Sequence, residues 1–215
     1  MREIQDHWFR EAKKEGYRSR AAFKLLQVLQ KRPALMGRGS NVLDVGAAPG
    51  SWTQVAAKAV GPRGGVYSVD LNPISPQGLP DQVRLVTADA LQIDPTEGQG
   101  PVFDVVLSDM APATSGHPST DHLRSVNLCN SLLDRLILWL RPGGNLVMKV
   151  FEGSEYPALL ARGNAGFKRF KGFKPQASRA ESVEMFLIGE GFVPDPDQAP
   201  PESVAPRRSR GWNPG

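Results

Sequence analysis

The chain of 215 residues is long enough for one domain with a complete hydrophobic core, and its hydrophobic content of 40% is typical of a globular protein. No apolar run reaches the roughly 20 residues of a membrane-spanning helix, and the charged N-terminus lacks the apolar core of a signal peptide. Cys129 is the single cysteine, which excludes an internal disulfide and offers no metal cluster. We therefore expect a cytoplasmic protein with no membrane association and no metal.

The net charge of +4 conceals two basic blocks that flank an acidic centre. Residues 1–40 contain ten Lys or Arg against four Asp or Glu, and residues 162–179 contain six basic residues and no acidic one. Blocks of this kind are most often solvated surfaces. The alternative is a surface that binds a polyanion, because phosphates are attracted to Lys and Arg.

Short apolar strands alternate with amphipathic helices along most of the chain. The first clear helix is expected over 19–32, with Ser19 as its N-cap. The elements expected after it are strands at 41–46, 64–71, 83–90, 103–112 and 145–153, helices at 52–61, 120–144 and 157–167, and a strand pair or meander at 182–192. This alternation predicts the α/β class, with a mostly parallel central sheet and helices on both faces.

The alternating pattern ends near residue 192, which sets the expected domain boundary. We expect a single domain over 1–192, whose N-terminal helical segment is 1–40. The remaining residues, 193–215, are rich in proline and polar side chains, and this composition predicts a disordered tail.

The stretch DVGAAPG (44–50) joins the first predicted strand to the next helix. In an open parallel sheet, ligands bind at such strand ends, and Gly46 and Gly50 let the backbone approach a ligand because they lack Cβ. The spacing is not the G-x-G-x-x-G of dinucleotide-binding folds, and Pro49 removes one N–H that a pyrophosphate would need. The loop suits a nucleoside with a charged amino-acid or sulfonium end, with an ordinary strand–helix turn as the alternative.

Acidic residues mark three successive predicted strands, at Asp44, Asp70 and Asp89. Asp70 follows Gly50 by twenty residues, a spacing at which a carboxylate can accept hydrogen bonds from both ribose hydroxyls of a nucleoside. Asp89 ends the third strand, from where it can reach an adenine amino group. Each of the three could instead be a surface acid or a helix cap.

Five motifs occur in order and together span nearly everything from residue 17 to residue 192. They are YRSRAAFKL (17–25), LDVGAAPGSW (43–52), VLSDMAP (106–112), VMKVFEG (147–153) and KPQASRAESVEMF (174–186). In these motifs the chain resembles the FtsJ-like family of ribosomal-RNA 2′-O-ribose methyltransferases, which use S-adenosylmethionine. The resemblance implies a Rossmann-like methyltransferase fold.

The resemblance also implies the site residues. The implied catalytic tetrad is Lys24, Asp109, Lys149 and Glu184, the last in preference to Glu181. The predicted cofactor-binding residues are Gly46, Ala47, Pro49, Gly50, Trp52, Asp70, Asp89 and Asp109. Two departures from the family are visible: Phe186 stands where many relatives carry tyrosine, and the loop after Asp109 lacks an asparagine often found there.

Lys149 lies in the apolar run VMKVF, where a charge needs a partner. Methyl transfer from a sulfonium to a ribose hydroxyl needs alignment and loss of the hydroxyl proton. We expect Lys149 to be the central group, with Lys24 and Glu184 holding the ribose. A free lysine is protonated at neutral pH, so the sequence leaves open whether Lys149 is a base or an orienter that stabilises the developing alkoxide.

The two basic blocks are then expected to hold RNA phosphates from opposite sides of the catalytic cleft. The predicted RNA contacts are Arg18 and Arg20 from the first block, and Lys168, Lys171, Lys174 and Arg179 from the second. Phe167, Phe170 and Phe173 are interpreted either as base-stacking residues or as part of the core.

These observations predict a monomeric enzyme that methylates a ribose 2′-hydroxyl with S-adenosylmethionine as cofactor. The predicted substrate is a uridine of large-subunit (23S) ribosomal RNA, with the large ribosomal subunit as its setting. A transfer-RNA 2′-O-methyltransferase and an RNA-binding ribosome assembly factor without turnover are the alternatives. A nucleotide-dependent oxidoreductase would need the dinucleotide glycine spacing, which is missing.

Overall fold

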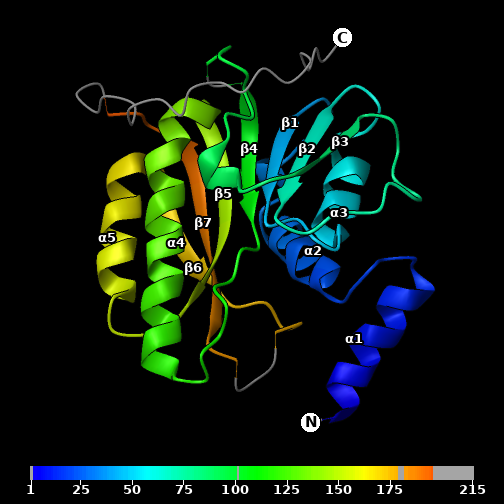
Figure 1. Ribbon diagram of the computed structural model, residues 1–215, viewed down its shortest axis with the longest axis horizontal. Coiled ribbons are helices and arrows are strands. Elements are labelled where there is room, and N and C mark those ends of the chain that lie inside the picture. Colours follow the sequence, from blue (N-terminus) through cyan, green and yellow to red (C-terminus); the bar gives the residue numbers. More distant parts are fainter. Residues whose placement is uncertain (1, 101, 179–181, 196–215) are drawn as a thin grey trace.

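The computed structural model describes residues 2–100, 102–178 and 182–195 (Figure 1), with side chains from residue 7 onward. Within these ranges, seven strands form one sheet in the order β3-β2-β1-β4-β5-β7-β6. The strands are β1 (Asn41–Val45), β2 (Gly65–Asp70), β3 (Val83–Thr87), β4 (Phe103–Ser108), β5 (Leu140–Phe151), β6 (Phe167–Phe173) and β7 (Glu184–Phe192). The helices are α1 (Arg2–Lys14), α2 (Ala21–Lys31), α3 (Ser51–Val60), α4 (Pro118–Trp139) and α5 (Tyr156–Gly166), with short 3₁₀ turns η1 (Pro33–Leu35) and η2 (Ala90–Gln92).

The sheet is mostly parallel, which confirms the predicted α/β fold. Strands β1 to β5 pair in parallel, whereas β7 runs antiparallel between β5 and β6. The first strand, β1, lies in the interior of the sheet. The next two strands, β2 and β3, follow outward on one side of β1, and β4 lies on its other side. The strand order therefore reverses between β1 and β4, which is where ligands bind in sheets of this kind.

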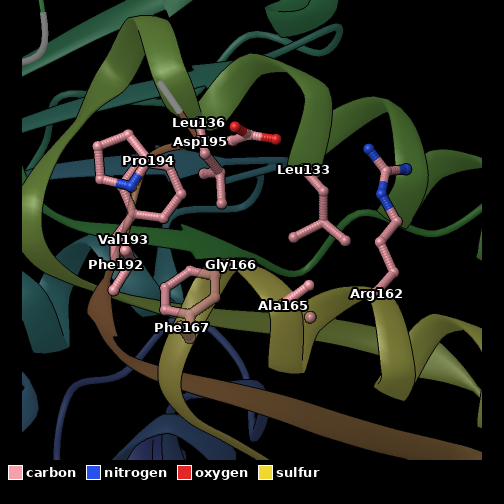
Figure 2. Close-up of a pocket in the computed structure, with 11 residues that line it drawn as sticks. Leu133, Leu136, Arg162, Ala165, Gly166, Phe167, Phe192, Val193, Pro194 and Asp195 are labelled. Atoms are coloured by element: carbon pink, nitrogen blue, oxygen red, sulfur yellow. The ribbon is translucent and has the colours of Figure 1, made fainter. Parts of the chain in front are cut away.

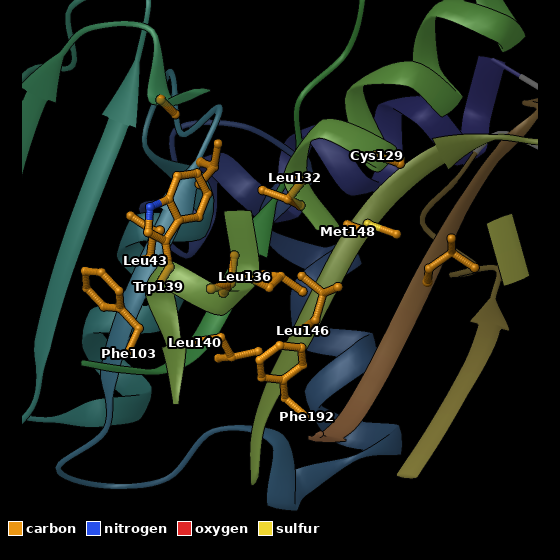
Figure 3. Close-up of a cluster of buried hydrophobic side chains, with 14 of the residues drawn as sticks. Leu43, Phe103, Cys129, Leu132, Leu136, Trp139, Leu140, Leu146, Met148 and Phe192 are labelled. Atoms are coloured by element: carbon orange, nitrogen blue, oxygen red, sulfur yellow. The ribbon is translucent and has the colours of Figure 1, made fainter. Parts of the chain in front are cut away.

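Helices cover both faces of the sheet, and the period-two alternation of side chains decides which face each residue serves. On β5, Leu146, Met148 and Val150 pack with α4 and α5, whereas Val147 packs with α2 and α3. Figure 3 shows the first of these clusters around the fully buried Trp139. Fully burying a large apolar side chain contributes about 1.5–3 kcal/mol, so these two layers supply most of the stabilisation that orients the strands.

Two predicted boundaries on the C-terminal side are wrong. The long helix ends at Trp139 rather than at residue 144, because Leu140 already pairs with Phe103 and begins β5. The last segment is one long strand, β7, where a strand pair or meander was expected. It is antiparallel to both β5 and β6, and β6 was not predicted as a strand. The sequence FKRFKGF of β6 buries Phe167 and Phe170, three residues apart, so it lacks the strict alternation that indicates a strand.

The N-terminal segment is helical, as predicted, but it consists of two helices. The second, α2, begins at Ala21 instead of residue 19. Ser19 precedes the helix, and its hydroxyl accepts a hydrogen bond from the Ala21 amide at 3.2 Å. None of the helices in the described ranges combines the length and apolar character needed to cross a bilayer. The predicted tail lies outside the described residues from residue 196 onward, and the domain boundary at 192 stays a prediction.

Candidate active site

The glycine loop follows β1 at the carboxyl edge of the sheet and adopts backbone conformations that favour glycine. Gly46 has φ of 71° and Gly50 has φ of 102°. A Cβ at Gly46 would lie 2.7 Å from Cγ and 2.9 Å from the backbone nitrogen of Met110, so only glycine lets the loop after β4 come this close. Gly50 donates its N–H to the carbonyl of Ala47 at 2.6 Å, which closes the turn before α3.

A cavity of about 330 Å³ lies between this loop and the ends of β2, β3 and β4. Four of the predicted cofactor residues line it, namely Gly46, Asp70, Asp89 and Asp109. Ala47, Pro49 and Trp52 border a small adjoining recess instead. This volume is at the lower end of the range of small-molecule sites.

Trp52 is a packing residue more than a wall of the cavity. It is only 2% exposed, its indole N–H donates to the carbonyl of Ala21 at 2.8 Å, and its ring lies 5.5 Å from that of Phe186. The sequence left packing and cofactor contact open for Trp52, and the geometry favours packing.

Two carboxylates in the cavity already shape the protein around it. One oxygen of Asp70 accepts the N–H of Ala48 at 2.9 Å, and the other accepts the N–H of Asn72 at 2.8 Å. Asp89 accepts the N–H of Leu91 at 2.9 Å and so caps the turn η2. A carboxylate can accept about four hydrogen bonds, so both groups keep acceptor capacity for a ligand.

The four residues of the predicted tetrad meet beside this cavity, and the strand register explains why. Lys149 on β5 is directly opposite Phe186 on β7, so their side chains share one face of the sheet. Glu184 lies two residues before Phe186 and points to the same face. Asp109 follows β4, the parallel neighbour of β5. Helix α2 covers this face and brings Lys24 to the same place (Figure 1).

The tetrad consists of two ion pairs. The Nζ of Lys24 lies 2.7 Å from Oε2 of Glu184, and the Nζ of Lys149 lies 2.9 Å from Oδ1 of Asp109. Lys149 also donates a hydrogen bond to the backbone carbonyl of Asp109 at 2.6 Å. Both lysines are 8% exposed. The apolar run around Lys149 therefore has the charge partner that it requires.

Glu184 has a pKa below its usual value. Burial alone would raise it, but the charge and hydrogen bond of Lys24, together with the more distant charge of Lys149, outweigh burial and lower the pKa. Glu184 is consequently an anion at neutral pH. Its carboxylate can therefore accept hydrogen bonds.

Asp44 lies behind the glycine loop and shows the opposite behaviour. It is fully buried, and burial raises its pKa to about 7; the hydrogen bond from Thr53 opposes this, and the charges of Asp109 and Asp70 add to it. Thr53 donates to Oδ2 of Asp44 at 2.8 Å and lies 2.9 Å from the hydroxyl of Ser68. The sequence marked Asp44 as one of three strand acids, but its position is in the core beneath the cavity.

Sequence reasoning assigned no role to His122, which the structure places next to the tetrad strand. Its ring is 5% exposed, Nε2 accepts the N–H of Glu155 at 2.9 Å, and Nδ1 lies 2.8 Å from the carbonyl of Phe151. Nδ1 must therefore carry the proton, and the neutral ring ties α4 to the loop after β5. A histidine within an amphipathic helix gives no sequence signal for such a contact.

The predicted RNA contacts are only partly where the sequence placed them. Lys168, Lys171 and Lys174 are exposed, although Lys168 lies toward the opposite end of the sheet from Glu184. Arg179 lies outside the described residues. Arg18 donates from its guanidinium to backbone carbonyls of the protein, in hydrogen bonds that are exposed at the surface.

The two basic blocks contact each other in the structure. Phe23 of α2, Ala12 of α1 and Ala177 from the second block form one small hydrophobic cluster. The N–H of Ala177 also donates to the side chain of Gln27 at 3.2 Å. Apolar residues within each block therefore join the two blocks, and the prediction that they hold RNA from opposite sides of the cleft stays a prediction.

The three phenylalanines of the second block are mainly structural. Phe167 and Phe170 are buried in the cluster that contains α4, and Phe173 packs against the cluster on the other face. The core interpretation is confirmed for Phe167 and Phe170.

A larger cavity, of about 580 Å³, lies far from the tetrad. Figure 2 shows it between α4, α5 and the residues that follow β7, with Leu133, Phe167 and Phe192 in its wall. Phe167 and Phe192 pair at the end of β6 and β7 that is distant from Glu184. This cavity contains none of the predicted site residues.

The fold and the cavity together define a Rossmann-like methyltransferase, and the similarities of the chain identify the family. Residues 17–192 match the model of the FtsJ-like methyltransferase family. The chain therefore belongs to this family. It is 45% identical over 189 residues to the ribosomal RNA large subunit methyltransferase E of Syntrophobacter fumaroxidans, which covers 86% of this chain and 95% of that relative.

Two further similarities are to a second relative and to a solved structure. The chain is 41% identical over 195 residues to the protein of the same name from Archaeoglobus fulgidus, covering 89% of this chain and 98% of the relative. A solved structure from Plasmodium falciparum, described as a ribosomal RNA methyltransferase, has a TM-score of 0.67 at 25% identity. It covers 82% of this chain and 98% of that chain.

Proposed function

We propose that this protein methylates a ribose 2′-hydroxyl of large-subunit ribosomal RNA and uses S-adenosylmethionine as the methyl donor. The observation that carries the proposal is the convergence of the two ion pairs beside the cavity. Asp109 connects the cavity to the ion pairs, because it lines the cavity and lies 2.9 Å from Lys149. A methyl donor in the cavity would thus be adjacent to the charged groups that can hold the acceptor ribose.

The cavity fits the chemistry of this donor. Asp70 and Asp89 offer carboxylate oxygens to ribose hydroxyls and to an adenine amino group, and Gly46 lines the same cavity without a side chain. The bound sulfonium would supply an activated methyl group. Asp109 carries a negative charge at the point where the cavity meets the tetrad, which suits a positively charged ligand.

The tetrad is arranged to align a hydroxyl rather than to bind one tightly. Both groups within bonding distance of the Lys149 Nζ, the carboxylate and the carbonyl of Asp109, are acceptors. Because the Nζ donates to these acceptors, we assign Lys149 to the orientation of the 2′-hydroxyl and the stabilisation of the developing alkoxide. Glu184, held as an anion by Lys24, can accept the hydrogen bond of the ribose and keep it in line.

The names of the relatives and the exposed lysines support ribosomal RNA as the substrate. The relatives from Syntrophobacter fumaroxidans and Archaeoglobus fulgidus are named ribosomal RNA large subunit methyltransferases. Phosphate contacts from lysines give affinity but little sequence choice, so a folded RNA within the large subunit would supply specificity. A uridine as the target, a monomeric state and a cytoplasmic location stay predictions.

The test is methyl transfer from radiolabelled S-adenosylmethionine to purified large subunits, small subunits and bulk transfer RNA. Wild type and Lys149→Ala are compared, and the labelled RNA is digested to identify the modified sugar. We expect label on a ribose of the large subunit in the wild type and loss of that label in the variant. Label only on transfer RNA would move the substrate, and no label with intact cofactor binding would favour an assembly factor without turnover.

A further inference from the structure

Arg18 lies between helix α2 and the glycine loop, and its guanidinium contacts two separate backbone segments. Nη1 donates to the carbonyl of Pro49 at 2.8 Å. Nη2 donates to the carbonyl of Ser75 at 2.6 Å and to that of Gln77 at 2.7 Å. Pro49 belongs to the glycine loop, and the other two follow β2, at whose end Asp70 lines the cavity. The planar, five-donor guanidinium is suited to binding several acceptors at once.

The glycine loop is shaped to receive this side chain. Gly50 has φ of 102°, and a Cβ there would overlap Nη1 of Arg18. Burial lowers the pKa of Arg18, which shows that the guanidinium is partly withdrawn from water. A residue that binds phosphate from solvent would instead keep its donors directed outward.

The side chain of Gln54, on the first turn of α3, also binds the segment that contains Arg18. Its Nε2 donates to the carbonyl of Gly16 at 2.9 Å, and its Oε1 accepts the N–H of Arg18 at 2.9 Å. The side chain thus binds the backbone on both sides of residue 17, as a neighbouring strand would. A third link joins the hydroxyls of Ser19 and Ser51, which are 2.7 Å apart.

This segment leads directly into α2, the helix that carries Lys24. Ala21, the first residue of α2, accepts the indole N–H of Trp52 from α3. The buried faces of the two helices also meet in one hydrophobic cluster. Figure 1 shows α2 and α3 as neighbouring helices. A shift of residues 16–21 would therefore move Lys24 relative to the cavity.

We propose that Arg18 and Gln54 are positioning residues that hold the cofactor loop, the loop after β2 and the helix bearing Lys24 in one arrangement. Arg18 acts through protein carbonyls and not through RNA phosphate. The inference rests on the proposed function, because it assumes that the cavity binds the adenosyl cofactor. It goes further in predicting that a side chain outside the cavity controls cofactor affinity in the absence of RNA.

The test measures binding of S-adenosylhomocysteine by calorimetry with no RNA present. Arg18→Lys keeps the positive charge but loses the fork that reaches three carbonyls. We expect Arg18→Lys and Arg18→Ala to weaken binding by about tenfold, the cost of roughly one charged hydrogen bond. Gln54→Ala is expected to weaken binding by about threefold or more, since it loosens Arg18 indirectly.

Two matched variants separate positioning from general stability and from RNA contact. Gln82→Ala removes an amide that lies 3.5 Å from the carbonyl of Ala57 and 3.4 Å from that of Gly61, at the far end of α3. Arg20→Lys changes the neighbouring arginine and keeps its charge. Both should bind S-adenosylhomocysteine as the wild type does. Thermal unfolding of each variant confirms that the compared proteins are folded.

The outcomes distinguish this inference from the proposed function. Wild-type affinity in Arg18→Lys and Gln54→Ala would overturn the inference and leave the function standing. An affinity loss in Gln82→Ala as large as that in Gln54→Ala would also overturn it, since any destabilisation of α3 would then suffice. Failure of the wild type itself to bind S-adenosylhomocysteine would overturn the function, and the inference with it.

Discussion

The ammonium of Lys24 lies 2.7 Å from the carboxylate of Glu184, although 160 positions separate the two residues in the chain. Lys24 comes from a helix that precedes the sheet, and Glu184 begins the last strand. The ion pair therefore joins the N-terminal part of the domain to its last strand. The charge of Lys149 also lowers the pKa of Glu184, although by less than that of Lys24.

The Lys24–Glu184 pair should stabilise the fold in a pH-dependent way. The folded-state pKa of Glu184 lies below its unfolded value of 4.5, so the stabilisation is present above pH 4.5 and is lost as the pH falls through the folded-state pKa. Glu184→Gln should lower the free energy of unfolding at pH 7 by about 1–3 kcal/mol, because Lys24 loses its charged partner. Denaturant titrations from pH 3 to pH 8 should show the two proteins converging at acid pH.

One result of this experiment would contradict the prediction. A difference between Glu184→Gln and wild type that is the same at pH 3 and pH 7 would mean that the charge of Glu184 does not contribute. The exposed residue Glu155, changed to Gln, is the control, and it should give no such pH-dependent difference.

Lys149 should affect turnover far more than cofactor binding, because it contacts Asp109 and does not line the cavity. We expect Lys149→Ala to reduce the single-turnover rate by about 10²–10⁴-fold, the usual contribution of a group that assists proton transfer or charge stabilisation. Lys149→Arg keeps the charge and should retain part of the rate. Calorimetry with S-adenosylhomocysteine should give near wild-type affinity for both variants. Near-normal turnover in Lys149→Ala would contradict the assignment.

The family resemblance implied the tetrad, with each member in a separate motif, but the sequence could not predict how the members pair. Pairing depends on register: Phe151 opposes Glu184, and Lys149 opposes Phe186 across β5 and β7. Register between antiparallel strands distant in sequence has no local signal. Lys24 was placed on its helix correctly, but the contact to β7 exists only once the helix packs on the sheet.

Arg18 is a residue for which the prediction from the sequence and the contacts in the structure differ. Its place in a basic block favoured an RNA contact, since composition reports charge and not direction. The structure instead directs the guanidinium to Pro49, Ser75 and Gln77. The strand β6 was missed for a related reason, because its exposed lysines and arginine resembled a solvated basic segment. In both cases tertiary contacts decide what local composition leaves open.

The close contact at Gly46 gives a prediction with a matched control. Gly46→Ala would place a Cβ 2.7 Å from Cγ of Met110, in addition to the strain of a positive φ. Gly78 has nearly the same φ, 72°, but nothing lies within 4 Å of its missing Cβ. Gly78→Ala should therefore cost only the backbone strain, about 1 kcal/mol, whereas Gly46→Ala should also displace Met110 and weaken cofactor binding.

Thermal unfolding and S-adenosylhomocysteine titration of Gly46→Ala and Gly78→Ala separate the two effects. We expect a lower Tm for both variants and a loss of affinity, about tenfold or more, for Gly46→Ala alone. Equal affinity in the two variants would show that the approach of Met110 to the glycine loop is not needed for the cavity.

Ionisation of Asp44 should lower the free energy of unfolding as the pH rises, whereas ionisation of Glu184 should not. Burial raises its pKa from 3.8 to about 7, so between these values the folded protein holds a proton that the unfolded chain releases. Under that condition the free energy of unfolding falls as the pH rises, by up to about 4 kcal/mol in total.

Asp44→Asn keeps an acceptor for Thr53 and removes the titration. The variant should therefore show a flatter profile between pH 4 and pH 7 and greater stability at pH 8. Asp81→Asn, at an exposed aspartate, should follow the wild-type profile. Parallel profiles for Asp44→Asn and wild type would show that burial does not raise the pKa of Asp44 in the folded protein.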